Sequence, residues 1–238
     1  MSSHEDHEIK KEFQLERIIF FSDAVFAIII TILVLDVRLP EVVKYASEAA
    51  ANTAFFKILP KLLGYIIAFY IIGGLWMRHL RMFSFLKDYN RQLVILNLLF
   101  LLSVSLYPFG QSLFFSSGDF MQYHLGGYIY VLIVYFSVFT QTLLIGYLVM
   151  NKADLCVKSD KIEMALRWKT MKVNYFAIPV MFILLFCTVV FNFSGRVFWI
   201  AVVIKFVVMK VLDFIYYRHY KEDKVSILSF FRRSSKVR

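Results

Sequence analysis

The 238-residue sequence carries little charge and contains no hydrophilic stretch long enough to form a separate soluble domain. Charged residues make up 18% of the chain and hydrophobic residues 60%, whereas a soluble domain has close to 25% charged residues. The apolar residues also occur in long blocks that polar connections separate. These features exclude an ordinary soluble fold and indicate an integral membrane protein.

Sequence motifs of common enzymes and metal sites are also absent. The chain has no His-Glu-x-x-His zinc motif, no Gly-x-Ser-x-Gly elbow and no Gly-rich phosphate-binding loop. No metal ligands surround His4, His7 or His124, and the two cysteines, Cys156 and Cys187, lie in different segments without metal-ligand spacing. We therefore expect no enzymatic activity, no bound cofactor and no metal site.

Six apolar segments predict six transmembrane helices in one all-α domain that covers residues 1–238. Each reaches the length of about 20 residues that a helix needs to cross about 30 Å of hydrocarbon, and only helices satisfy their backbone groups within one segment. No signal peptide is expected, because the first apolar run is long and lacks a clear cleavage site. The predicted spans are 18–36, 58–77, 92–115, 125–150, 173–193 and 196–217.

The lysines and arginines are distributed unevenly between the two sides of this predicted bundle. Twenty of the 27 lie in the N-terminal arm, the second and fourth connections and the C-terminal tail, and five lie on the other side of the bundle, in its connections or at the ends of its spans. This asymmetry predicts that both termini are cytoplasmic and that the cytoplasmic face attracts anionic lipid headgroups. The net charge of +10 forms no continuous basic face and no nucleic-acid-binding motif, so we expect no nucleic-acid partner.

Asp23 lies inside the cytoplasmic end of the first predicted span, where a carboxylate needs a partner, a proton or contact with water. Trp76 and His79 are three residues apart and share a face of the second span, and Asn97 lies in the cytoplasmic half of the third. We predict a buried network among these residues and Ser22. Two interpretations of Asp23 stay open: a structural carboxylate, or a group that takes part in ion conduction or a proton relay.

Further along the first span, Ile28, Ile32 and Leu35 recur at i, i+4 and i+7, with Thr31 beside them. This stripe fits ordinary helix packing. It also fits an apolar ring that faces a pore and gates it by dewetting. Periodicity does not decide between the two interpretations.

The last predicted span contains Lys205, Lys210 and Asp213. The spacing of Lys210 and Asp213 predicts an ion pair at i, i+3. A carrier using Asp23 and Lys205 is an alternative, but the chain has no internal repeat with broken spans in matching positions. A non-conducting membrane scaffold is a third interpretation.

The first span carries a longer motif, Arg17-x-x-x-Phe21-Ser22-Asp23, followed by an Ala/Phe/Ile-rich helix. Together with Trp76, His79 and Ser103-x-x-x-Tyr107-Pro108, it resembles the transmembrane protein 175 family of endosomal and lysosomal potassium channels. The resemblance implies a single-repeat, prokaryotic-type member in the plasma membrane. It also implies a homotetramer whose first helices line the pore, without the Thr-Val-Gly-Tyr-Gly filter, which this chain lacks.

The resemblance assigns expected roles to individual residues. Ile28 matches the isoleucine bottleneck, Thr31 a threonine layer, and Ile32 and Leu35 further pore-lining positions. The motif residues Phe21, Ser22 and Asp23 are implied to hold the first helix to its neighbours, and Arg17 belongs to the same structural motif. The implied function is a channel for potassium and similar monovalent cations, with K⁺ as the permeant ion; the alternative is a proton-coupled secondary transporter or a proton leak.

Overall fold

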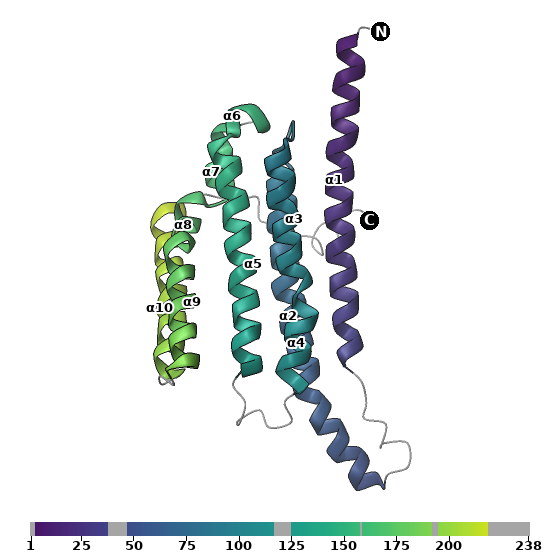
Figure 1. The fold of residues 1–238 in the computed structure, drawn as a ribbon, viewed down its shortest axis with the longest axis vertical. Coiled ribbons are helices and arrows are strands. Elements are labelled where there is room, and N and C mark those ends of the chain that lie inside the picture. The colour runs from purple at the N-terminus through teal and green to yellow at the C-terminus, as the bar shows by residue number, and fades with distance from the viewer. Residues whose placement is uncertain (1–2, 38–46, 117–124, 158, 192–194, 219–238) are drawn as a thin grey trace, which may run out of the picture.

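The computed structural model describes residues 3–37, 47–116, 125–157, 159–191 and 195–218, and within them the chain is helical apart from short connections. The long helices run side by side with alternating direction (Figure 1). They are α1 (Ser3–Leu33), α2 (Glu48–Phe83), α3 (Arg91–Ser105), α4 (Tyr107–Ser116), α5 (Leu125–Met150), α9 (Asn174–Val190) and α10 (Gly195–Tyr217). The short ones are the 3₁₀ helix η1 (Val34–Asp36), α6 (Lys152–Leu155), α7 (Ser159–Ala165) and α8 (Trp168–Met171).

Four helical segments are long and apolar enough to cross a membrane: Ile58–Phe83, Arg91–Phe115, Gly126–Met150 and Trp168–Thr188. They correspond to four of the six predicted spans. The other two predicted spans form α1 and α10, which carry charged residues along their apolar stretches. The crossing of the membrane by α1 and α10 therefore stays a prediction.

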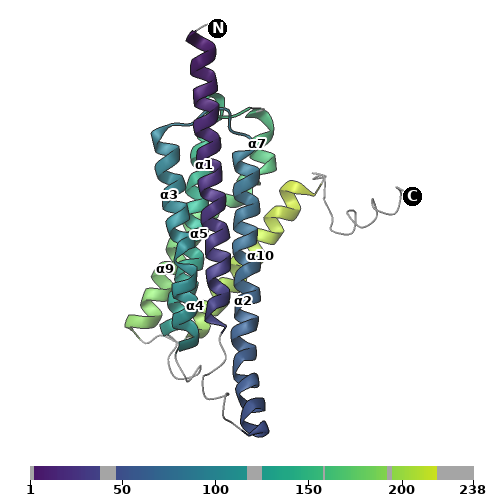
Figure 2. The ribbon, with the colours of Figure 1, turned by 90° about the vertical axis from the view of Figure 1, so that its right-hand side faces the viewer.

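Helix α5 lies at the centre of the bundle, packed on one side against α3 and α4 and on the other against α9. Helix α1 packs against α2, α3 and α4, and α10 packs against α9 and α8. Helix α1 and the α9–α10 pair therefore lie on opposite sides of the molecule (Figure 1). The first turns of α1 extend beyond the other helices, and α10 is inclined to them (Figure 2).

Several helices differ from their predicted bounds. The α-helix of the first predicted span, 18–36, ends at Leu33, and that of the fifth, 173–193, ends at Val190. The third predicted span, 92–115, is divided at Leu106 into α3 and α4. Because Pro108 has no backbone N–H, it cannot continue the hydrogen-bond ladder, so the helix is interrupted just before it.

The second predicted span, 58–77, is part of the longer α2, which places Arg78 and Arg81 in the last turns of that helix rather than in a connection.

The connections 84–90 and 151–167 lie at the same end of the bundle as the start of α1 (Figure 1). They are joined through their backbones, since the amide of Lys87 donates to the carbonyl of Leu155 at 2.9 Å and that of Val157 to Phe85 at 2.7 Å. Lys152 also pairs with Glu163 at 2.7 Å. The two connections therefore form one structure at this end of the bundle, and their sequences contain five of the chain's 27 lysines and arginines.

Candidate functional site

A chain of hydrogen bonds joins three helices near the start of the first predicted span. The Asn97 side-chain amide donates to Ser22 Oγ at 2.9 Å, and Ser22 Oγ donates to the carbonyl of Ile18 at 2.8 Å. Because the amide nitrogen of Asn97 is used in this way, its Oδ1 accepts, at 2.9 Å, from Nε2 of His79. Ser22, His79 and Asn97 are all buried. These hydrogen bonds therefore hold α1 to α2 and α3 without contact with solvent.

Asp23 takes part in a separate contact at the edge of this region. Its Oδ1 accepts a hydrogen bond from Trp76 Nε1 at 2.8 Å. Asp23 is half-buried and Trp76 is partly exposed. The structure therefore brings the five predicted network residues into two adjacent groups, one buried and one at the surface, rather than into the single buried network predicted.

Three aromatic side chains complete the surroundings of His79. Its ring stacks on Phe83 with 4.1 Å between centroids, and the rings of Phe26 and Phe100 lie at 5.7 Å and 5.8 Å. Sequence reasoning missed these three residues, because a phenylalanine inside an apolar span carries no signal of its own. The spacing of His79 and Phe83 at i, i+4 is the one local clue to their contact.

The other two motif residues, Arg17 and Phe21, are exposed on α1. They share that surface with the predicted pore residues. Ile28 is 56% exposed, Ile32 44% and Leu35 55%. Thr31 is exposed as well, and its hydroxyl donates to the carbonyl of Ile28 at 2.8 Å.

The opposite face of α1 is the one that packs within the chain. Phe26, Ile29 and Leu33 are nearly inaccessible there, at spacings of three and four residues that keep them on one side of the helix. Helix α1 therefore has two apolar faces of different kinds. One is buried against α2, α3 and α4, and the other, which carries Ile28, Thr31 and Ile32, is exposed among the residues that the structure describes. Leu35 is exposed on the 3₁₀ helix η1 that follows α1.

Two further buried hydrogen bonds join the broken third segment to α5. Ser103 Oγ lies 2.9 Å from Thr140 Oγ1, and the Tyr107 hydroxyl lies 2.9 Å from Ser137 Oγ. Ser103 and Tyr107 belong to the residues that carry the family resemblance. Their partners on α5 were not identified from the sequence, because a lone Ser or Thr in a spanning helix often bonds its own helix backbone, as both of these also do.

The prediction of an ion pair between Lys210 and Asp213 is wrong. Asp213 Oδ2 instead pairs with Arg167 at 3.0 Å. The i, i+3 spacing makes a Lys210 contact possible, but Asp213 faces α8, where the Arg167 side chain reaches it. Lys210 lies over the ring of Phe206, and Lys205 lies 4.4 Å from the centroid of the Tyr135 ring.

Among the residues that the structure describes, no three His, Cys, Asp or Glu side chains come together as a metal site would require. The arrangement around Ser22 and Asp23 consists instead of neutral hydrogen bonds and one carboxylate–indole contact. Such groups position a helix, and they do not form a catalytic centre that is recognisable from its geometry.

Comparison with known proteins gives this arrangement a context. Residues 17–108 match the family described as endosomal/lysosomal potassium channel TMEM175. A potassium channel of Streptomyces collinus is 37% identical over 92 residues, which cover 39% of this chain and 43% of that protein. A potassium channel of a Chryseobacterium species is 40% identical over 88 residues, covering 37% and 42%. These matches span less than half the length of either relative.

A rat protein named endosomal/lysosomal proton channel TMEM175 is 28% identical over 136 residues, which cover 55% of this chain and 25% of that protein. Among solved structures, a lysosomal potassium-selective channel TMEM175 homolog from Chamaesiphon minutus has the same fold. Its TM-score is 0.61 at 24% identity, with 84% of this chain and 96% of that chain covered. The predicted resemblance is thus confirmed, and the chain is a membrane protein that is similar, over residues 17–108, to the TMEM175 potassium channel family.

Proposed function

We propose that this chain is one subunit of a homotetrameric channel for potassium and similar monovalent cations. The first helix of each subunit lines the pore, and Ile28, Ile32 and Leu35 form a hydrophobic constriction with Thr31 beside it. The names of the relatives support a potassium channel. K⁺ is the permeant ion, and the channel needs no cofactor.

The observation that carries this proposal is the uncovered apolar face of α1. Ile28 on α1 and Leu35 on the following 3₁₀ helix η1 are each more than half exposed, although α1 is packed on its other side. One such helix encloses no path, but several copies around an axis would place Ile28 in a ring. A narrow apolar ring excludes water and so blocks hydrated ions until it widens.

The polar contacts of α1 fit the same role. The bond from Asn97 to Ser22 and the bond from Trp76 to Asp23 fix the helix to α2 and α3 near one end of the pore-lining stretch. A constriction depends on the placement of its side chains, and a helix held by buried hydrogen bonds has little freedom to rotate. We therefore assign Ser22, Asp23, Trp76, His79 and Asn97 a positioning role.

We place the end of the bundle that carries connections 84–90 and 151–167 at the cytoplasmic face of a prokaryotic plasma membrane. The start of α1 then lies on the cytoplasmic side, in agreement with the distribution of lysine and arginine. The basic tail 219–238, for which the same side is predicted, lies outside the described residues. Anionic headgroups of that leaflet are the natural neighbours of this surface.

A proton leak or a proton-coupled transporter is the second candidate function. It is favoured by the name of the rat relative, which is a proton channel, and by the half-buried carboxylate of Asp23 on the same helix as Ile28. A proton flux in liposomes that persists without potassium and disappears in Asp23→Asn would support this candidate.

Potassium flux into liposomes that contain the purified protein tests the first proposal. Ile28→Asn should wet the constriction, raise the flux and weaken the discrimination against sodium. Ile183→Asn is the matched control, because Ile183 is 61% exposed on α9, on the far side of the bundle from α1. Absence of flux in all three proteins, with the oligomer intact, would refute the pore assignment.

A further inference from the structure

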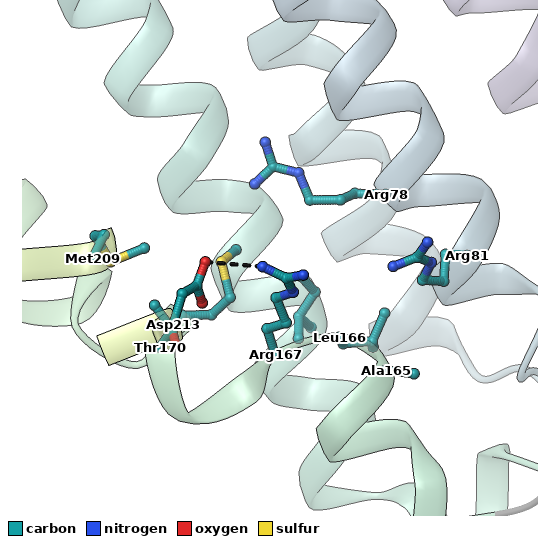
Figure 3. Close-up of a pocket in the computed structure, with 10 residues that line it drawn as sticks. Arg78, Arg81, Ala165, Leu166, Arg167, Thr170, Met209 and Asp213 are labelled. Atoms are coloured by element: carbon teal, nitrogen blue, oxygen red, sulfur yellow. Dashed lines mark hydrogen bonds and ion pairs between the residues drawn. The ribbon is translucent and has the colours of Figure 1, made fainter. Parts of the chain in front are cut away.

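A second polar site lies away from α1, where α2, α8 and α10 meet. It is a cavity of about 300 Å³ whose polar lining consists of Arg78, Arg81, Arg167, Thr170 and Asp213 (Figure 3). These side chains come from three helical regions, namely the last turns of α2, the start of α8 and the second half of α10. The channel proposed above uses none of them.

Arginine side chains predominate in the polar lining of the cavity. Three guanidinium groups line it with one carboxylate, and that carboxylate, Asp213, is already paired with Arg167 at 3.0 Å. Arg78 uses only Nε, in a hydrogen bond of 3.4 Å to the carbonyl of Gly74 in its own helix. Within the described residues no carboxylate lies at ion-pair distance from Arg78. This lining disfavours a cation and favours an anion.

Two polar atoms of the lining also lack a hydrogen-bond partner within the part of the chain that the structure describes. They are the hydroxyl of Thr170, a residue that is only 2% exposed, and Oδ1 of Asp213. A buried polar atom without a partner costs free energy, and such atoms are usually satisfied by water or a ligand. A ligand that both accepts from the Thr170 hydroxyl and donates to Asp213 would satisfy the two atoms.

The backbone of Arg167 has an unusual conformation, which places its side chain in this cavity. Its φ of 52° puts it in the left-handed region, the one positive φ among the described non-glycine residues. This conformation is unfavourable for a residue with a Cβ. It turns the chain between α7 and α8 and directs the guanidinium of Arg167 toward Asp213, inside the cavity (Figure 3).

We propose that this cavity is a binding site for a phosphate group. The planar guanidinium of Arg78 offers further N–H donors in the geometry that suits phosphate oxygens. Thr170 donates its hydroxyl to the same group. A hydroxyl carried by the ligand, either a glycerol hydroxyl of a lipid headgroup or the O–H of protonated phosphate, donates to Asp213 Oδ1. The phosphate belongs to a phospholipid headgroup or to a free phosphate ion, since both present this chemistry.

The test is equilibrium binding to the purified full-length protein in neutral detergent. One series titrates phosphatidylglycerol, with phosphatidylcholine as the lipid control, and another titrates inorganic phosphate. Arg78→Gln removes one guanidinium from the cavity. Arg91→Gln is the matched control, because Arg91 is an exposed residue at the start of α3, outside the cavity, and its loss changes the net charge equally.

Saturable binding by the wild type, weakened about tenfold or more in Arg78→Gln and unchanged in Arg91→Gln, is the expected result. Binding of phosphatidylglycerol alone identifies a lipid headgroup, and binding of both probes shows that phosphate is sufficient. Equal losses of affinity in Arg78→Gln and Arg91→Gln would show that binding depends only on general surface charge, and would overturn the proposal. So would the absence of saturable binding of either probe.

Thr170→Val provides a second variant if Arg78→Gln does not fold. It keeps the shape of the side chain and removes only the hydroxyl, which bonds nothing else in the described structure. Because valine relieves an unpartnered buried hydroxyl, the variant should melt no lower than the wild type without ligand. Its phosphate affinity should nevertheless fall severalfold. Unchanged affinity in this variant would contradict the assigned role of Thr170 and the site with it.

Discussion

The indole Nε1 of Trp76 donates to Asp23 Oδ1 at 2.8 Å and joins α2 to α1 across 53 positions of sequence. Three residues further along α2, His79 reaches the same helix through Asn97 and Ser22. Helix α1 is thus held by one partly exposed and one buried contact. The two contacts predict different responses to substitution.

Loss of the Asp23 carboxylate should destabilise the protein and its oligomer. Asp23→Ala leaves the indole N–H of Trp76 without its partner, and we expect a loss of about 1–2 kcal/mol, since the pair is partly exposed. Trp76→Phe should cost a similar amount, and the double variant should cost less than the sum. Thermal unfolding and size-exclusion chromatography in detergent measure both effects. Normal assembly and function of Asp23→Ala would contradict the positioning role.

Asn97→Ala should be more damaging than its position in an apolar helix suggests. It removes the partner of both Ser22 and His79 in a buried region, where each unsatisfied group costs about 1–3 kcal/mol. Ser105→Ala is the control on the same helix, because the exposed Ser105 hydroxyl bonds only the carbonyl of Leu102. The melting temperature of the control should stay close to that of the wild type. Equal melting temperatures of the two variants would rule out the buried network as a source of stability.

The exposed face of α1 should meet its counterparts in neighbouring subunits. Ile28→Cys, in a background without Cys156 and Cys187, should be joined into dimers by a short thiol cross-linker, because four such residues would surround one axis. Ile183→Cys, equally exposed but on α9, should remain monomeric on a denaturing gel. The reverse pattern would place the subunit contacts on α9 and remove α1 from the pore.

Arg167 allows its backbone and side-chain roles to be separated. Arg167→Ala and Arg167→Gly both lose the pair with Asp213, but only glycine adopts the left-handed φ of 52° without steric cost. Arg167→Gly should therefore be more stable than Arg167→Ala by about 1 kcal/mol. Thermal unfolding of the two variants side by side provides the measurement. An alanine variant as stable as the glycine variant would show that this backbone conformation is not retained.

The Lys152–Glu163 pair predicts a small dependence of stability on pH. The hydrogen bond from Lys152 lowers the pKa of Glu163 below its ordinary value of 4.5. A lowered folded-state pKa gives stability that is present above the unfolded pKa and lost as pH falls through the folded one. The pair is about 40% exposed, so its contribution is at most about 1 kcal/mol. Glu163→Gln should melt slightly below the wild type at pH 7 and equally at about pH 3. A gap that persists in acid would indicate a cause other than charge.

The helices themselves were largely predictable from the sequence. The fourth predicted span, 125–150, coincides with α5, and the last, 196–217, differs from α10 by one residue. Hydropathy and segment length are local properties, and a single apolar segment in lipid satisfies its backbone groups within itself only as a helix. The break at Leu106 was not predicted as a helix end, because a proline in a spanning helix produces a kink or an interruption depending on its neighbours.

The residues of the site were identifiable from the sequence, but the tertiary structure determined which of them contact one another. Polar groups such as Ser22, Asp23 and Asn97 are conspicuous in an apolar span because burying them is costly. Their division into two groups and the choice of Arg167 as the partner of Asp213 depend on which helix faces meet. Periodicity describes a residue's place on its own helix, whereas a contact across helices is determined by the packing of the whole bundle.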